Sequence, residues 1–261
     1  MSRYLKIWKR FTLLAFANTL SNSVDALGYF LGKIIRFAFF IVLIYSIFRF
    51  SNSLGGYGKY GVLFIFTTFH LVDISTQLFF RGLYDLPELV QKGQIDFALV
   101  KPMNPLFFAL FRYADILDAL FMIPIFGVLF YSIAKISVPI TFENVVLYIV
   151  LLFFGILIAT SFHILAAALT LIFSENRGII WLYRESLTFA RFPQEIFQQG
   201  VSLVFTYVMP VFIMVSYPAR AFLGTLSTAK VFVGIFYSIA FFLMSFFLWK
   251  LSLKKYTSPS S

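Results

Sequence analysis

The sequence predicts an all-α integral membrane protein with six transmembrane helices. Of its 261 residues, 61% are hydrophobic and 12% are charged, whereas soluble domains carry about 25% charged residues. The apolar residues form runs long enough to cross a bilayer, and the charges gather at the ends of these runs. The net charge is +10. In a membrane protein such an excess of Lys and Arg is explained by cations on the cytoplasmic side, which set the topology and contact anionic lipids, so we expect no nucleic-acid partner.

The first 25 residues predict a cytoplasmic helix that lies in the membrane interface. Arg3, Lys6 and Arg10 recur at helical spacing on one face, and aromatic residues occupy another face. The alternative is that this stretch is the polar start of the first spanning helix. We expect no cleavable signal peptide, because no short apolar region with a small-residue cleavage site follows the basic start.

We expect the transmembrane domain to extend from residue 26 to residue 251, with a cytoplasmic tail at 252–261. Long apolar runs predict spans at 26–50, 60–81, 106–136, 145–173 and 231–251. Pro124 predicts a kink in the third span, and Lys33 and Arg36 are expected to snorkel from the first span to the cytoplasm. Most cations then lie inside, so both termini are predicted to be cytoplasmic.

The part of the chain from 178 to 228 is harder to interpret. Because lysines follow the last span, this part must cross the membrane an odd number of times, which brings the total to six. Either 178–192 crosses and the proline-broken segment 193–228 dips in from the outside, or 178–195 lies on the cytoplasmic surface and 201–216 crosses. The sequence alone leaves both alternatives open.

A polar loop at 82–105 joins the second and third spans on the cytoplasmic side. The stretch DLPELVQKG within it predicts a helix from Asp85 to Lys92. Asp85 is a suitable N-cap, and Glu88 three residues later completes a capping box. Glu88 and Lys92 form a favourable i,i+4 pair, and Gly93 is suited to end the helix in the left-handed conformation.

This short helix needs a surface to dock against, because two turns are unstable alone in water. Its apolar face consists of Leu86, Leu89 and Val90. That face either packs on its own membrane domain or docks on a cytoplasmic partner. After the helix, Asp96 and Lys101 flank a hydrophobic turn, and Pro102 and Pro105 stiffen the approach to the third span.

Four stretches of the chain carry a family resemblance. They are GQIDFALVKPMNPLF (93–107), FARFPQEIF (189–197), FTYVMPVFIMVSYPARAFLG (205–224) and LKKYTS (253–258). In this order, and together with six spans and an N-terminal interface helix, they resemble bacterial type-2 ABC exporter permeases. The resemblance covers most of the chain in architecture, and it points to a branch whose second membrane subunit is often encoded separately.

This resemblance implies a permease subunit of an ATP-binding-cassette exporter in the bacterial plasma membrane. A second permease, identical or paralogous, would complete the translocation path. The polar loop would carry a coupling helix that docks into a groove of a cytoplasmic ATPase subunit, which would bind ATP and Mg. Pro193, Pro210 and Pro218 would lie in re-entrant helices at the outer mouth, which favours the crossing of 178–192.

The resemblance also assigns residues to coupling. They are Asp85, Leu86, Glu88, Leu89, Val90, Lys92, Gly93, Asp96, Lys101 and Pro102. Closure of the ATPase around ATP would push the helix 85–92, and this push would switch the gate between inward- and outward-facing states.

The residues that common enzymatic chemistry requires are missing from the sequence. The nearest match to a phosphate-binding loop, GYFLGKI at 28–34, is one residue too short and has no Ser or Thr after the lysine. The chain also has no cysteine, so it has no thiolate nucleophile and no thiolate metal ligand. We therefore expect no catalytic residue, no metal site and no bound cofactor, and we expect ATP hydrolysis on a separate subunit.

Several polar residues lie inside the predicted spans, where they usually face the protein interior or an aqueous path. His70, Asp73 and Gln77 share one helical face of the second span. They either line the translocation path or a permease–permease interface, or form a satisfied structural network that includes His163. Arg184 and Glu185 fall in the middle of the 178–192 crossing, so they must face a partner or a pore, or that crossing is wrong.

Three arginines recur every seven residues and therefore share a helical stripe. They are Arg177, Arg184 and Arg191. The stripe is either an interfacial basic face or a cationic pore lining for an anionic substrate.

Two other functional classes compete with an exporter permease. A proton-coupled secondary transporter would relay protons through His70 and Asp73. A membrane enzyme that processes lipids would use Asp115 and Asp118, which are three residues apart near the cytoplasmic end of the third span. The sequence does not identify the substrate.

Overall fold

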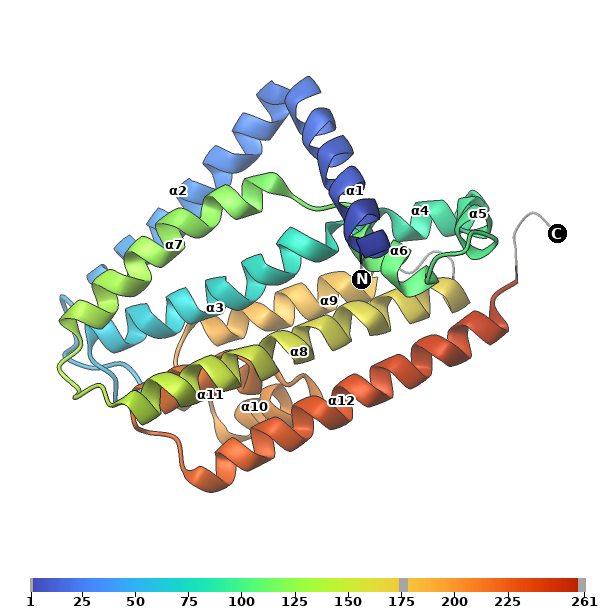
Figure 1. Ribbon diagram of the computed structural model, residues 1–261. Helices are drawn as coiled ribbons and strands as arrows, with labels where there is room; N and C mark the ends of the chain where they lie inside the picture. Colours follow the sequence, from blue (N-terminus) through green and yellow to red (C-terminus); the bar gives the residue numbers. More distant parts are fainter. Residues whose placement is uncertain (1, 174–177, 258–261) are drawn as a thin grey trace.

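The computed structural model is a bundle of α-helices and describes residues 2–173 and 178–257 (Figure 1). The α-helices are α1 (Ser2–Ser21), α2 (Ser23–Ile47), α3 (Lys59–Phe80), α4 (Leu86–Gln91), α5 (Gln94–Leu99), α6 (Pro105–Phe111), α7 (Ile116–Lys135), α8 (Phe142–Phe173), α9 (Gly178–Leu187), α10 (Gln199–Leu203), α11 (Val211–Phe222) and α12 (Thr228–Lys255). The last four residues of the predicted tail lie outside the described residues.

Among the described residues, five helical stretches are long and apolar enough to cross a membrane: α2, α3 with its continuation to Gln91, α7, α8 and α12. The stretches Gln199–Val208 and Val211–Phe222 would together supply a sixth span, but they meet at an angle of 101°. The prediction of an all-α protein with several transmembrane helices is therefore confirmed.

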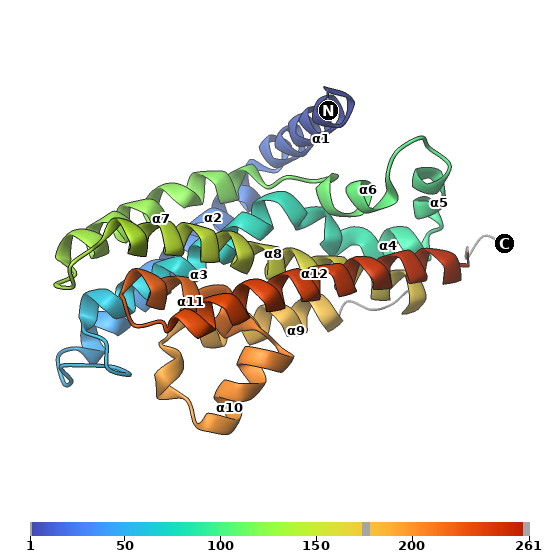
Figure 2. The ribbon, with the colours of Figure 1, turned by 60° about the horizontal axis from the view of Figure 1, so that its bottom comes forward.

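α8 runs through the middle of the bundle and contacts α3, α4, α6, α9, α11 and α12, as well as the 3-10 helix Arg81–Asp85. Figures 1 and 2 show α12 beside α8 along much of its length. Small residues such as Ala159 and Ala167 are buried on α8 and let neighbouring helices approach closely. The closest approach is at Gly155, where an added Cβ would overlap the Met214 carbonyl of α11.

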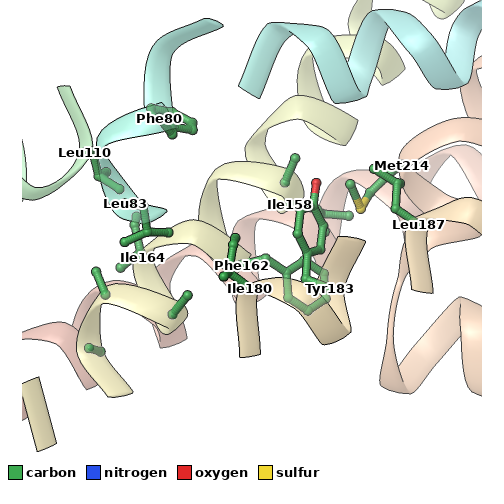
Figure 3. Packing of buried hydrophobic residues seen from close by; sticks show 14 of the residues in the cluster. Phe80, Leu83, Leu110, Ile158, Phe162, Ile164, Ile180, Tyr183, Leu187 and Met214 are labelled. Carbon is green, nitrogen blue, oxygen red and sulfur yellow. The ribbon is translucent and has the colours of Figure 1, made fainter. Parts of the chain in front are cut away.

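The main apolar core joins α8 to α9 and α11. Phe162 of α8 stacks on Tyr183 of α9 with ring centroids 4.8 Å apart. Ile158, Leu187 and Met214 belong to the same cluster (Figure 3). Because lipid is as apolar as these side chains, tight van der Waals packing must supply much of the attraction that holds α9 in place.

α1 is a separate helix that meets α2 at a sharp angle (Figure 1). Its first turns pack on the segment before α6. Arg3 donates a hydrogen bond to the Pro102 carbonyl at 2.8 Å, and the Asn104 amide donates to the Tyr4 hydroxyl at 3.2 Å. Tyr4 also meets Phe107 edge to face, with centroids 4.8 Å apart. The N-terminal helix is thereby attached to the polar loop.

The predicted third span at 106–136 is wrong at its start, because the structure divides it into α6 and α7. Each helix has its own N-cap. The Asn104 side chain accepts from the Leu106 amide at 2.9 Å, and the Asp115 side chain accepts from the Leu117 amide at 3.0 Å. The Asp115 amide is taken by the Leu78 carbonyl of α3 at 3.1 Å, so the chain cannot continue as one helix there. Pro124 lies within α7.

The proline-broken segment begins and ends at the same end of the bundle. The Tyr57 hydroxyl, in the α2–α3 loop, is 3.2 Å both from Glu195 and from the Thr225 hydroxyl. Arg220 closes this cluster with an ion pair to Glu195 at 3.0 Å. Between these points the chain bends at Pro210 and returns through α11, which contains Pro218. Among the described residues α9, with ten residues, is not one of the helices long enough to cross a membrane, so both alternatives for 178–228 remain predictions.

Gly155 offers a test of the α8–α11 contact. Gly155→Ala is expected to force α8 and α11 apart, because the new methyl group meets backbone rather than a flexible side chain. The loss should be about 1–3 kcal/mol of stability, measured as a lower Tm in detergent. Gly127→Ala in α7 is the control, since its Cβ meets nothing within 4 Å and alanine favours a helix. Equal Tm values for the two variants would refute the close contact.

Candidate functional site

A cavity of about 570 Å³ lies among α2, α3 and α9, and it collects most of the polar residues predicted inside the spans. Its lining includes five cations: Lys33, Arg36, Arg81, Arg184 and Arg191. It includes three acids: Asp73, Asp85 and Glu185. A smaller hollow of about 60 Å³ lies beside this cavity and has six lining residues in common with it. His70 and Gln77 are among the other residues that line the smaller hollow. The structure therefore brings the His70–Gln77 face of α3 together with Arg184, as a lined path would require.

The three polar residues of α3 have different surroundings. The Gln77 side chain donates to the Tyr84 hydroxyl at 3.1 Å and accepts from Arg81 at 3.3 Å. The His70 ring is enclosed by aromatic rings, and its Nε2 has no hydrogen-bond partner among the described residues. The predicted network with His163 is not formed, because His163 bonds the Ala159 carbonyl of its own helix at 2.7 Å.

Arg184 faces the cavity rather than lipid. Its guanidinium donates to the Tyr84 hydroxyl at 2.7 Å and lies 3.9 Å from the Asp73 carboxylate. Glu185, the next residue, is exposed at the cavity wall. A charge in this position is tolerated because Arg184 has two polar partners, Asp73 on α3 and Tyr84 in the 3-10 helix that follows α3. Arg177, the first member of the predicted arginine stripe, lies outside the described residues.

Arg191 is held by aromatic rings. Its guanidinium carbon lies 4.7 Å from the centroid of Phe40 and 5.2 Å from that of Phe69. Both distances are in the range of cation–π contacts. Arg191 and Arg184 line the same cavity, so two of the three predicted stripe residues do come together.

The two aspartates of the competing enzyme hypothesis are engaged in ion pairs. Asp118 of α7 is fully buried and pairs with Lys33 of α2. Asp115 caps α7 and lies 3.7 Å from the Arg81 guanidinium. Sequence reasoning missed the first pair and expected Lys33 to snorkel instead. The available signal was Asp118 itself, because a carboxylate one turn inside a span needs a cation at its depth.

No cluster of three or more His, Asp or Glu residues that could hold a metal ion occurs among the described residues.

The polar loop is a compact structure whose first helix, α4, packs on its own membrane domain. Leu86 and Val90 are buried, and α4 contacts α8. The Glu88–Lys92 ion pair is formed at 2.6 Å, and Gly93 has a φ of +66° in the left-handed region. The apolar face predicted for docking is therefore largely occupied by the protein itself.

The predicted capping box is wrong. The Asp85 side chain makes no cap hydrogen bond, because the residues before it, Arg81–Asp85, already form a 3-10 helix. Asp85 lies instead 3.3 Å from Arg112, which also donates to the Gly82 carbonyl at 2.7 Å. Burial lowers the pKa of Arg112, and the carboxylates of Asp85 and Glu88 oppose that shift. Arg112 thus ties the start of the polar loop to the break between α6 and α7.

The second helix of the loop, α5, presents apolar side chains outward. Phe97 is 68% exposed and Val100 is 82% exposed. The exposed charge of Lys101 follows them, and Pro102 is held by Arg3. Asp96 accepts a hydrogen bond from the Tyr256 hydroxyl near the C-terminus at 3.0 Å. The C-terminal segment therefore contacts α5, and the N-terminal helix contacts the segment that follows it.

Comparison with known proteins identifies one family. A family model described as "ABC-2 family transporter protein" matches residues 34–260. The searches of curated proteins and of solved structures return no significant match.

The Lys33–Asp118 pair generates a stability prediction. Lys33→Met leaves a fully buried carboxylate without its partner, and breaking a buried pair in this way costs about 3–5 kcal/mol. The double variant Lys33→Met/Asp118→Leu is expected to recover most of the loss, because no buried charge remains. Thermal unfolding of the two variants in detergent measures the difference. A double variant as unstable as Lys33→Met would contradict the pairing.

Proposed function

Because the chain belongs to the ABC-2 transporter family, it is a permease component of an ABC transporter, and we propose that it couples to a separate ATPase to export its substrate. The absence of a phosphate loop from the sequence is consistent with ATP hydrolysis on another chain. The observation that carries the proposal is the exposed apolar face of α5, at the end of the bundle where the polar loop and both described chain ends meet (Figure 1).

The docking surface consists of the exposed part of the polar loop. Phe97 and Val100 supply its apolar centre, and Glu88, Lys92 and Lys101 supply its charged rim. Exposed apolar side chains on a well-packed loop outside the long spans favour a protein partner over solvent. We therefore propose that the contact lies mainly on α5, one helix after the apolar face of α4 that was one of the two sequence-based alternatives for docking.

Movement of α5 has a direct route into the transmembrane helices. α5 packs against α4 and α6, and both of these contact α8. α8 in turn contacts α3, α9, α11 and α12, so a displaced loop moves the helix on which the bundle is built. We propose that ATPase closure tilts α8 relative to the cavity wall and thereby changes the accessibility of the cavity.

A second permease, identical or paralogous, would complete the path. The outer face of α2 supports this part of the proposal, because it exposes apolar side chains one turn apart: Leu27, Leu31, Ile35, Phe39 and Val42. Lipid and a partner helix both suit such a face. We place the protein in a bacterial plasma membrane with both termini in the cytoplasm.

The competing functions receive less support from the geometry. The Asp73 carboxylate is directed to Arg184, and the His70 ring is enclosed by phenylalanines, which does not favour a proton relay between them. Asp115 and Asp118 are each paired with a cation, which does not favour their use as catalytic acids.

Phe97→Asp tests the docking surface. A buried aromatic anchor at an interface is worth about 2 kcal/mol or more, so the variant should retain far less ATPase during purification from native membranes. Azido-ATP labelling of the co-purified subunit measures the loss. Its Tm should stay at the wild-type value, because Phe97 is mostly exposed.

Phe50→Asp is the matched control, since Phe50 is 93% exposed in the α2–α3 loop, far from α5. Undiminished ATPase recovery with Phe97→Asp would refute the α5 surface, as would an equal loss with Phe50→Asp.

Single cysteines test the proposed topology, and the chain has no other cysteine to interfere. Ser53→Cys in the α2–α3 loop should react with an impermeant maleimide in intact cells. Gln94→Cys at the start of α5 should react only in inverted vesicles. Both positions are exposed. The reverse labelling pattern would invert the orientation.

A further inference from the structure

The cavity among α2, α3 and α9 carries positive charge that its own acids do not neutralise. Lys33, Arg81 and Arg184 each have an acidic partner within 4.0 Å. Arg36 and Arg191 line the same cavity, and neither has an acid within that distance among the described residues. Two guanidiniums in one membrane-embedded cavity therefore remain available to a ligand.

Arg191 has the features of a built anion site. The rings of Phe40 and Phe69 hold its guanidinium in a cation–π arrangement. Its Nε is buried and has no hydrogen-bond partner among the described residues. A buried donor without an acceptor costs free energy, and a ligand oxygen that accepts a hydrogen bond from the guanidinium would offset that cost. The planar fork of a guanidinium matches the oxygens of a phosphate.

The walls of the cavity indicate what else the ligand contains. Trp181, Tyr29 and Tyr113 contribute aromatic surface around the cations. The volume of about 570 Å³ suits a head group and the start of an acyl chain rather than a whole lipid. α2, which forms one wall, presents apolar residues on its outer face, where a longer chain could lie among lipids.

We propose that this cavity binds an anionic amphiphile through its phosphate group, with Arg36 and Arg191 as the ligands of that phosphate. The inference rests on the proposed transport function, since it names the class of substrate for the same path.

The probe is dodecyl phosphate, titrated into the purified protein in dodecyl maltoside, with tryptophan fluorescence as the readout of binding. Arg36→Gln and Arg191→Gln are each expected to weaken binding about tenfold, because each removes a charge-assisted hydrogen bond. Arg49→Gln is the matched control. Like Arg36→Gln, it removes an exposed arginine. Arg49 lies in the α2–α3 loop and does not line the cavity. The affinity of this variant should equal that of the wild type.

Three results would overturn the inference. Equal affinity of all three variants would mean that dodecyl phosphate partitions into the detergent belt. Equal binding of inorganic phosphate would mean an anion site without selectivity for an amphiphile. No binding at all would remove the site. Arg36 is exposed, so a folding defect does not confuse the result for Arg36→Gln. None of these measurements uses ATP. The proposal for the cavity can therefore be refuted while the proposal that Phe97 contacts the ATPase is supported, and the Phe97 proposal can be refuted while the cavity proposal is supported.

Discussion

A charge between apolar helices needs a partner, and ion pairs that meet this constraint join helices of the bundle. Lys33 and Asp118 join α2 to α7, and Asp73 and Arg184 join α3 to α9. Arg81 and Asp115 join the end of α3 to the start of α7. Each pair connects helices whose apolar contacts alone are interchangeable with lipid contacts. The ion pairs therefore help to set the position and register of α2, α3, α7 and α9 relative to one another, while α8 supplies the main apolar contacts of the bundle.

The same constraint separates structure from function in the cavity. Cations that fix helices have acids opposite them, and those at Arg36 and Arg191 do not. At the end of the bundle that we propose to be cytoplasmic, water solvates charged side chains. Exposed apolar side chains, rather than charges, are therefore the groups that indicate a binding surface there. Phe97 and Val100 are apolar side chains exposed to water, and Arg36 and Arg191 are charges in an apolar region without an acidic partner among the described residues. In both places the surroundings do not match the side chain, which favours a binding partner.

Much of the fold could be predicted from sequence because transmembrane helices are local in origin. The predicted second span at 60–81 differs from α3, Lys59–Phe80, by one residue at each end. Gly93 and the Glu88–Lys92 pair behave as predicted, since both depend on residues within one turn. The third span failed because its break depends on the Leu78 carbonyl, which lies on another helix and accepts the Asp115 amide.

Hydropathy and short-range capping are enough to predict the class of protein, the apolar helices and the presence of a folded polar loop, because all three depend on residues that are near one another along the chain. Which face of that loop is free depends on contacts between segments that are far apart in the sequence. Leu86 and Val90 looked available along the chain, but α8 and its neighbours cover them and leave Phe97 and Val100 outside. The tertiary structure also determines that Lys33 is paired while Arg36 is not, since the difference is the position of one carboxylate on α7.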